Sequence, residues 1–492
     1  MKQRILTELE PKQVFRYFED LTRIPRESGK EQEVTDYLIH FAQEHGLEYQ
    51  KDEFLNVVIR KNASPGYEGQ PGVILQAHSD MVCEKNSDLA HDFSKDPLPL
   101  VVRDGRVAAV GTTLGADNGL GVAIALAILS DPDACHPALE FLCTSDEERG
   151  MTGAIHFDFA QLTGASLLNL DGSDLGVLVT GCAGGPGAET VLPGDRTPAD
   201  PDWISMRLAI KGLTGGHSGE DIHRNRASAI KLLGRMLAAV EKVTEFRLCW
   251  ISGGQKYNAI PREAEAMILL PKETAEGAKD AVQKLILSLK DEYRVTEGGL
   301  AASANLERVG QKGSSEECNP FDRDITMAVV DFLTLCQNGV VRMDPEFEGL
   351  VESSVSLGVV RTEDDKIIFQ SLTRSSIESI YLDLFDNLRR LAHCVGAETS
   401  ILSNCPEWSY DPDSKLRRIC QDIYREMYGA DPQVLVLHAG LECGVFYKNA
   451  GRPLDMIAMG PDIRDLHAPG ESIIISSVQE FWDYFRQILA AL

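Results

Sequence analysis

The chain has 492 residues, 43% of them hydrophobic and 25% charged, so it is long enough for two or three domains with ordinary soluble cores. Asp and Glu outnumber Lys and Arg by 75 to 48, and the formal charge of −27 argues against nucleic acid and anionic membranes as partners, because a negative surface repels phosphate groups. No apolar run reaches the length of a membrane span, and Met1 to Arg4 lead into no signal-peptide core, so we expect a cytoplasmic protein.

Helices and strands are predicted to alternate in the first part of the chain. Apolar residues recur at helical spacing in 11–24 and 30–45, for example at Val34, Leu38 and Phe41. Residues 54–59 then have the composition of a strand. This alternation predicts an α/β domain.

The stretch from Val73 to Met81 is the first that indicates chemistry. Val73 to Ala77 is an apolar run typical of a strand buried on both faces, and His78 and Asp80 follow at its carboxyl end. Ligands of open α/β sheets bind at that edge. Alternate residues of an extended segment point the same way, so one side chain could bind a metal while the other orients it. A hydrogen-bonded structural histidine is the alternative.

Acidic residues also lie at the ends of three further predicted elements, one helix and two strands. Asp117, in the Gly-rich stretch 111–121, lies beside the start of a small-residue helix that runs through Ile128; it is either an N-cap or a carboxylate that bridges two cations. The strand 139–144 runs into Asp146-Glu147-Glu148, which is either a solvated acidic loop or a cation site, because adjacent carboxylates repel one another. The strand 166–170 runs directly into Asp171.

The character of the chain changes near residue 190. A Pro-rich and Asp-rich linker, 193–201, precedes new strands and helices that end near residue 400, and α/β character then returns with a predicted helix at 415–427 and strands at 434–437 and 456–459. We therefore predict a catalytic domain formed by 1–192 and 401–492, with 193–400 as an inserted domain.

The combination of imidazole and carboxylate suits a catalytic zinc, cobalt or manganese site, and the 11 cysteines include no Cys-x-x-Cys pair. Two metals about 3.5 to 4 Å apart need a bridging carboxylate and about two further ligands each. The candidate ligands that supply this number are His78, Asp117, Glu148, Asp171 and His467. Glu147 remains as a general base.

The motifs together resemble those of the co-catalytic zinc aminopeptidase and carboxypeptidase clan, whose members carry an inserted lid domain. They are His78-Ser79-Asp80, Gly115-Ala116-Asp117-Asn118-Gly119, Asp146-Glu147-Glu148, Asp171-Gly172 and His467. Within the clan the chain is similar, almost end to end, to the aminoacyl-histidine dipeptidases, also called peptidase D or Xaa-His dipeptidases. The motifs of the later part are Gly215-Gly216-His217-Ser218-Gly219, Asn258-Ala259-Ile260-Pro261-Arg262 and His438-Ala439-Gly440-Leu441-Glu442-Cys443-Gly444.

The resemblance implies an α/β zinc-peptidase catalytic domain, with a mixed sheet flanked by helices, and an inserted α+β lid domain. It implies two zinc ions per chain, one bound by His78 and Asp171 and the other by Glu148 and His467, with Asp117 as the bridge; cobalt or manganese are possible substitutes. Glu147 is then the general base for a metal-activated water, and Asp80 orients His78.

The resemblance also implies roles for the lid. His217 is expected to stabilise the oxyanion, and Asn258, Arg374 and Gly440 are expected to contact the substrate; a guanidinium can bind a carboxylate through two parallel bonds. An exposed ion-pairing arginine and a plain Gly-rich turn are the alternatives. A homodimer through the lid is implied as well.

The expected activity is metal-dependent hydrolysis of dipeptides, preferentially aminoacyl-histidine dipeptides such as β-alanyl-histidine (carnosine). A related N-acyl amino acid deacylase or an aminopeptidase with the same metals is the first alternative. The second is a catalytically silent metal-binding protein, against which the presence of Glu147 and Asp80 argues.

Overall fold

The computed structural model describes residues 4–307, 319–345 and 347–492. Contacts divide the chain into two compact units, each described here by itself. Unit 1 comprises Met1–Cys182, Trp408–Val436 and Leu441–Leu492, and unit 2 comprises Ala183–Glu407 and Leu437–Gly440. The predicted linker, 193–201, begins at the last residue of β9 (Gly185–Pro193) and ends just before β10 (Trp203–Lys211). Both strands belong to unit 2, so the linker lies within this unit.

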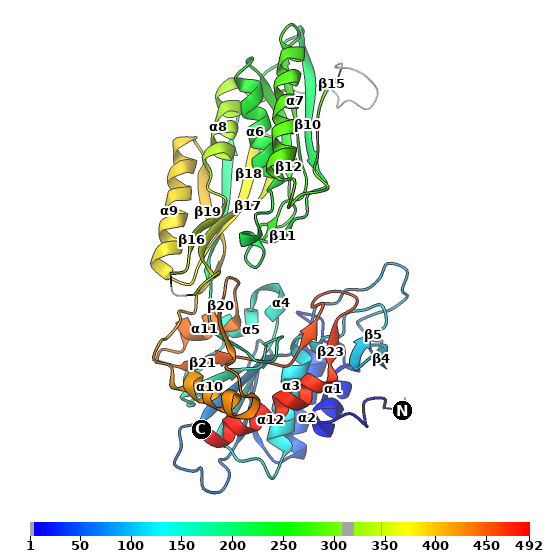
Figure 1. Ribbon diagram of the computed structural model, residues 1–492, viewed down its shortest axis with the longest axis vertical. Helices are drawn as coiled ribbons and strands as arrows, with labels where there is room; N and C mark the ends of the chain where they lie inside the picture. Colours follow the sequence, from blue (N-terminus) through cyan, green and yellow to red (C-terminus); the bar gives the residue numbers. More distant parts are fainter. Residues whose placement is uncertain (1–3, 308–318, 346) are drawn as a thin grey trace. The chain divides into compact units, whose positions relative to one another are not determined.

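Unit 1 is built on a mixed sheet, which the described residues form from eight strands (Figure 1). In spatial order these are β1 (Glu48–Lys51), β2 (Val57–Lys61), β6 (Leu139–Thr144), β3 (Val73–His78), β7 (Ser166–Asn169), β21 (Asp455–Ala458), β8 (Val177–Cys182) and β20 (Gln433–Leu437). The four central strands, β6, β3, β7 and β21, are parallel to their neighbours within this group. Their apolar composition reflects burial on both faces, since every residue of β3 and β6 is buried.

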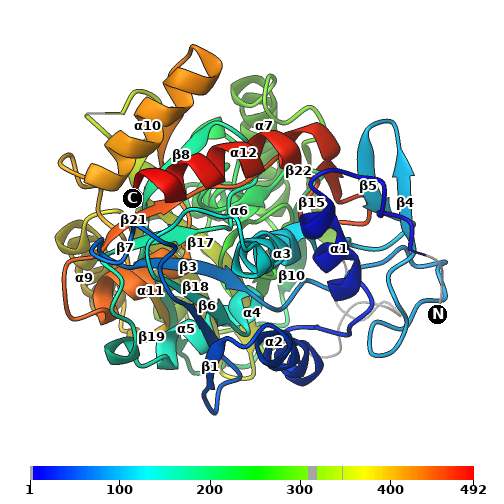
Figure 2. The same ribbon diagram turned by 90° about the horizontal axis from the view of Figure 1, so that it is seen from below.

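Helices flank this sheet, as predicted for the catalytic domain. They are α1 (Lys12–Leu21), α2 (Gln32–Glu44), α3 (Ala116–Ser130), α4 (Glu147–Gly150), α5 (Thr152–His156), α10 (Lys415–Tyr428), α11 (Glu442–Asn449) and α12 (Ile475–Ala491). Helix α1 lies beside α3, and α10 lies beside α12 (Figure 2). Helices α1, α2, α3, α10 and α12 share one apolar core with Val73, Leu75 and Ala77 of β3. Gln76 and His78 alternate with these residues, so they point to the opposite face of the sheet.

A small four-stranded sheet accompanies the large one in unit 1. Its strands, in order, are β22 (Ile463–Arg464), β23 (Ser472–Ile474), β5 (Arg106–Ala109) and β4 (Leu100–Arg103). The loop between β22 and β23 carries His467 and Glu471.

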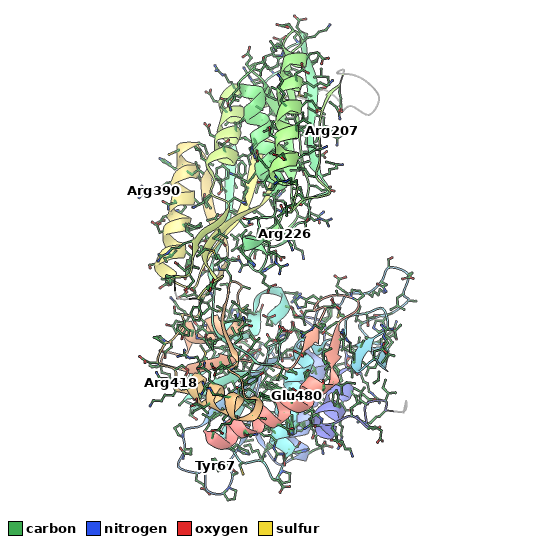
Figure 3. The ribbon with its side chains drawn as sticks, in the orientation of Figure 1. Tyr67, Arg207, Arg226, Arg390, Arg418 and Glu480 are labelled. Atoms are coloured by element: carbon green, nitrogen blue, oxygen red, sulfur yellow. The ribbon has the colours of Figure 1, made fainter. Side chains whose placement is uncertain are left out.

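Unit 2 contains an antiparallel sheet with helices on one face (Figure 1). Its strands, in order, are β15 (Ala301–Glu307), β10, β14 (Ala264–Pro271), β12 (Arg247–Gly253), β17 (Val351–Glu363), β18 (Lys366–Ser375), β9 and β19 (Glu398–Cys405), while β16 (Gly339–Met343) pairs with β17. A two-stranded ribbon of β11 (Gly216–His217) and β13 (Ala259–Ile260) is separate. Polar pairs cross this sheet; Arg207 of β10 (Figure 3) lies 2.6 Å from Glu265 of β14. An antiparallel sheet with its helices in a separate layer is an α+β architecture, as predicted for the inserted domain.

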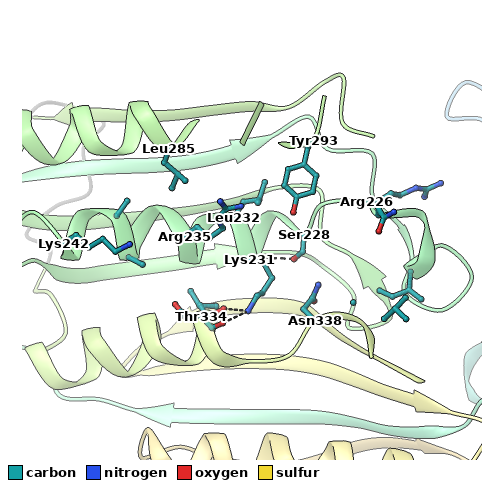
Figure 4. A pocket seen from close by; sticks show the side chains of 17 residues that line it. Arg226, Ser228, Lys231, Leu232, Arg235, Lys242, Leu285, Tyr293, Thr334 and Asn338 are labelled. Atoms are coloured by element: carbon teal, nitrogen blue, oxygen red, sulfur yellow. Dashed lines mark hydrogen bonds between the residues drawn. The ribbon is translucent and has the colours of Figure 1, made fainter. Parts of the chain in front are cut away.

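Three helices of unit 2 line one side of an open pocket of about 780 Å³ (Figure 4). They are α6 (Ala229–Glu241), α7 (Ala275–Glu292) and α8 (Arg323–Leu335), while α9 (Glu378–Cys394) lies outside the pocket. The Lys231 ammonium in this pocket donates to the carbonyl oxygens of Leu333, Thr334 and Cys336 at the end of α8. Arg235 forms two bonds to Glu292, at 2.6 and 2.8 Å. The side chains of Lys231 and Arg235 therefore hold neighbouring helices together.

Among the residues that the structure describes, none of the helices combines the length and the apolar character that a membrane span requires.

Candidate metal centre

Three parallel strands of unit 1 deliver the predicted acids and imidazole to one edge of the sheet. Strand β3 lies between β6 and β7 and ends at His78. Glu147 follows β6 after a turn, and Asp171 lies two residues beyond β7. Carboxyl ends of parallel strands meet at the same edge, so residues from distant parts of the sequence come together as expected.

Asp117 lies between two histidines. Its Oδ1 is 2.9 Å from His78 Nε2, and its Oδ2 is 3.2 Å from His467 Nε2. The N-cap of α3 is Gly115, and Asp117 itself has non-helical φ and ψ of −79° and 111° and is joined to Asn118 by a cis peptide bond. Among the described residues, the Asp117 oxygens contact the two histidines instead of capping backbone N–H groups, and these side chains could share a metal with it.

The remaining candidate ligands complete two groups that share Asp117. Asp171 Oδ1 lies 3.6 Å from His78 Nε2, and Glu148 Oε1 lies 3.0 Å from His467 Nε2. In each group, His78 with Asp117 and Asp171, and Asp117 with Glu148 and His467, the donor atoms all lie within 4.8 Å of one another. The Glu148 side chain is only 7% exposed, so the solvated-loop interpretation of 146–148 is wrong for this residue.

The electrostatics of the two groups favour cations. Hydrogen bonds that His467 donates to the carboxylates of Asp117 and Glu148 raise its pKa to about 11. Burial, followed by the neighbouring Asp117 carboxylate, raises the pKa of Asp171 to about 6. Neighbouring carboxylates contribute to both shifts, and divalent cations would offset this negative charge. The donor set of imidazoles and carboxylates thus fits two such ions.

Asp80 is fixed beside His78 by several donors. Its Oδ1 lies 3.3 Å from His78 Nδ1, and it accepts hydrogen bonds from Ser28 Oγ (2.7 Å) and from the backbone N–H groups of Glu147 (3.0 Å) and Glu148 (3.2 Å). Burial opposes ionisation of Asp80, but the hydrogen bonds, first that with His78, lower its pKa to about 2. A carboxylate at the second ring nitrogen holds the imidazole in the orientation that a metal ligand needs.

Glu147 is at the start of α4 and belongs to a third group of donor atoms, with His78 and Glu148. Burial raises the pKa of its carboxyl group well above the ordinary value, and the charge of His78 opposes this shift. The residue before it, Asp146, has a left-handed φ of 54°, and His467 has one of 60°. Such values are uncommon outside glycine and recur at functional sites.

Sequence reasoning missed a buried polar layer behind the ligands. Glu442 accepts hydrogen bonds from Gln76 Nε2 (2.6 Å) and Thr144 Oγ1 (2.9 Å), and Gln76 Oε1 accepts one from Asn169 Nδ2 (2.5 Å). The available signal was the position of Gln76 two residues before His78, on the same face of the strand. Glu442 lies in the motif 438–444, but the sequence alone indicates no role for it.

The predicted lid residues belong to unit 2, where some of them lie together. Arg374 Nη2 is 3.5 Å from His217 Nε2. His438 Nε2 is 2.7 Å from Oγ of Ser354, the residue opposite Arg374 in the pairing of β17 with β18. Burial and then the Arg374 charge lower the pKa of His217, and the same two causes lower that of His438 to about 3.

Asn258 and Gly440 are placed by the backbone of unit 2. The Asn258 carbonyl accepts a hydrogen bond from Ser218 N (3.0 Å), which fixes it beside the His217 turn. Gly440 ends the short segment Leu437–Gly440. An exposed ion-pairing role for Arg374 loses support, because this residue is only 8% exposed. A plain Gly-rich turn at His217 loses support as well, because His217 belongs to the short strand β11.

Residues 74–491 match the model of peptidase family M20/M25/M40. The chain belongs to this family. It is 36% identical to the cytosol non-specific dipeptidase of Escherichia coli K12, over 98% of both chains. It is 37% identical to the aminoacylhistidine dipeptidase of Vibrio alginolyticus, whose crystal structure it matches with a TM-score of 0.87 over 100% of this chain and 98% of that one. A tripeptidase of Staphylococcus aureus shares the fold, with 16% identity and a TM-score of 0.55 over 98% of both chains.

Membership of the M20/M25/M40 family confirms the peptidase class and the fold class that the sequence motifs predict. The family model begins at Ile74, within β3, and extends to residue 491. It therefore covers the five candidate ligands, Asp80 and Glu147.

Proposed function

We propose that this chain is a cytoplasmic dipeptidase that uses two metal ions. The observation that carries the proposal is the position of Asp117, whose two oxygens face His78 and His467 in two separate groups of donor atoms. A single metal site has no need of such a shared carboxylate. The names of the relatives from Escherichia coli and Vibrio alginolyticus, both dipeptidases, support the substrate class.

His78 and Asp171 are proposed to hold one ion, Glu148 and His467 the other, and Asp117 both. Nitrogen and oxygen donors without thiolate are compatible with zinc, and also with cobalt or manganese. Bound ions of this kind polarise a peptide carbonyl and lower the pKa of water to about 7.

The chain's own groups would perform the proton transfers. Glu147 lies among the donor atoms with His78 and Glu148, so it is placed to accept a proton from the attacking water and to return it to the leaving amine. Asp80 keeps the His78 ring in orientation through its contact with Nδ1. No covalent enzyme intermediate is needed in this scheme.

Unit 1 is the proposed catalytic domain and unit 2 the proposed lid, through which the chain would also form a homodimer. We assign stabilisation of the oxyanion to His217 and contacts with the substrate to Asn258, Arg374 and Gly440. The contact of Arg374 with His217 supports a shared role, since its charge helps to keep that imidazole neutral and able to donate one hydrogen bond.

Replacement of Arg374 by alanine is expected to raise KM for a dipeptide about 10- to 100-fold, because a charged hydrogen bond to the substrate carboxylate contributes about 1.5 to 3 kcal/mol. The same variant should leave KM for the corresponding dipeptide amide, which lacks the carboxylate, almost unchanged. Steady-state kinetics on the two substrates measure the difference. Arg390→Ala, on the exposed face of α9, is the matched control. An equal rise in KM for both substrates would show that Arg374 does not bind the substrate carboxylate.

The proposed preferred substrates are aminoacyl-histidine dipeptides such as β-alanyl-histidine. The test is release of histidine by the purified protein, before and after removal of metal with a chelator and after return of zinc. We expect loss of activity on removal and recovery with zinc. N-acetyl-histidine and a tripeptide, assayed in parallel, separate the deacylase and aminopeptidase alternatives. Two bound zinc ions without hydrolysis of any dipeptide would refute the proposal.

A further inference from the structure

A buried carboxylate in the His467 loop holds the segment that carries Asp117. Glu471 is 2% exposed and accepts hydrogen bonds from four consecutive backbone N–H groups. Its Oε2 accepts from Leu114 (2.7 Å) and Gly115 (2.9 Å), and its Oε1 accepts from Ala116 (2.7 Å) and Asp117 (3.2 Å). These N–H groups lie just before and in the first turn of α3, ahead of the interruption at Asp117 and Asn118.

The Glu471 carboxylate replaces the capping group that α3 would otherwise need. Here Glu471 satisfies the N–H groups, and the Asp117 carboxylate is free to face His78 and His467. The four hydrogen bonds also occupy both Glu471 oxygens, so Glu471 is not itself available as a metal ligand.

Arg26 holds the same segment from its other side. The guanidinium, 1% exposed, donates to the carbonyl oxygens of Gly115 (2.5 Å), Ser79 (3.2 Å) and Asp80 (3.0 Å). Gly115 therefore has its N–H on Glu471 and its carbonyl on Arg26. It has a left-handed φ of 66°, and a Cβ at this position would collide with Arg26.

We propose that Glu471 is a positioning residue, which joins the segment of His467 to that of Asp117 and thereby sets the affinity of the metal ion that these two residues share. The inference rests on the proposed two-metal function. Glu471 follows His467 by four residues in one loop, so the hydrogen bonds fix the ligand and the bridge relative to each other. The ion held by His78 and Asp171 shares Asp117 as well, but its other two proposed ligands lie at strand ends that Glu471 does not contact, so it is affected less.

The deciding variant is Glu471→Gln. Glutamine keeps the size of the side chain but replaces one oxygen with an NH2 group, which would face two N–H donors. We expect one zinc ion per chain to bind as in the wild type and the other to bind about 10- to 100-fold more weakly, the range for loss of a group that orients a ligand. Titration of the metal-free protein with zinc measures both affinities. The visible absorption of the cobalt-loaded protein should change for one ion only.

Asp455→Asn is the matched control. Asp455 also caps a helix from a distant segment: its oxygens accept from Ser414 Oγ (2.6 Å) and from the N–H groups of Lys415 and Leu416 (both 2.9 Å) at the start of α10. It begins β21 opposite Ser166, at the edge of the sheet away from Asp171. This variant should lose stability without a change in either metal affinity. Glu471→Asp, which keeps the charge, should recover part of the second affinity.

Two unchanged affinities in Glu471→Gln, with an unchanged cobalt spectrum, would overturn the inference. Equal weakening of both ions would also overturn it, because it would indicate general disruption. If Glu471→Gln does not fold, Glu471→Asp decides: a selectively weakened second ion supports the role, and wild-type affinities oppose it. The wild type is measured first. Fewer than two bound ions there would refute the proposed function itself, whatever the variants do.

Discussion

Glu147→Gln is expected to lower kcat for β-alanyl-histidine by about 10²- to 10⁴-fold, the usual contribution of a general base, while two zinc ions remain bound. The amide has nearly the shape of the carboxylate but accepts no proton from water. Its neighbours support retention of metal, since Glu148 and not Glu147 faces His467. Turnover and metal content, measured on the same preparation, test the two parts of this expectation.

The control for Glu147→Gln is the same chemical change at an exposed glutamate, Glu44→Gln at the end of α2. It should leave both quantities unaltered. Near-normal turnover in Glu147→Gln would show that another group accepts the proton. Loss of metal together with activity would instead make Glu147 a ligand.

His467→Ala is expected to bind one zinc ion tightly and to lose the second at micromolar free zinc, with turnover reduced about 100-fold or more. The imidazole is a proposed ligand of a site that would otherwise keep only Glu148 and the shared Asp117, and even groups that only orient a ligand contribute 10- to 100-fold to metal affinity. The metal content of the dialysed protein and a zinc titration measure the effect.

The matched control for His467 is His40→Ala on α2, where the imidazole is 68% exposed and lies 3.2 Å from Glu44. It should keep two ions and full activity. Retention of two tightly bound ions by His467→Ala would exclude this histidine as a ligand. A drop in turnover without loss of metal would point to a role with the substrate.

The strand ends could be predicted because their signal is local. The apolar runs that end at His78 and precede Glu147 and Asp171 identify buried strands, and a parallel sheet brings such ends together. By contrast, the pairing of Asp117 with His467 joins segments about 350 residues apart. Residue type makes both of them candidate ligands, but only the resemblance to known peptidases predicts that they share an ion, since spacing in the sequence gives no such distance.

Glu471 and Arg26 could not be predicted from local pattern. Both are charged residues in loops, a setting in which solvent exposure is the ordinary expectation, yet both are almost completely buried. Their partners are backbone groups, whose positions depend on the finished fold and not on residue type. The role of the segment 193–201 could not be predicted from composition either. Proline-rich and aspartate-rich loops join strands within a domain as well as separate domains, and this segment lies within unit 2.

The wide spread of the ligands along the chain has a consequence for how the protein acquires its metal. Three of the five candidate ligands precede residue 150 and the fourth is Asp171, but His467 is synthesised about 300 residues later, roughly 15 to 60 s at ribosomal rates. Until that segment has left the ribosome, the nascent chain carries the donor group of His78, Asp117 and Asp171, but the group of Asp117, Glu148 and His467 is incomplete. In the proposed two-metal centre, the ion shared by Asp117, Glu148 and His467 would therefore be bound only after His467 has emerged, when synthesis of the polypeptide is almost complete.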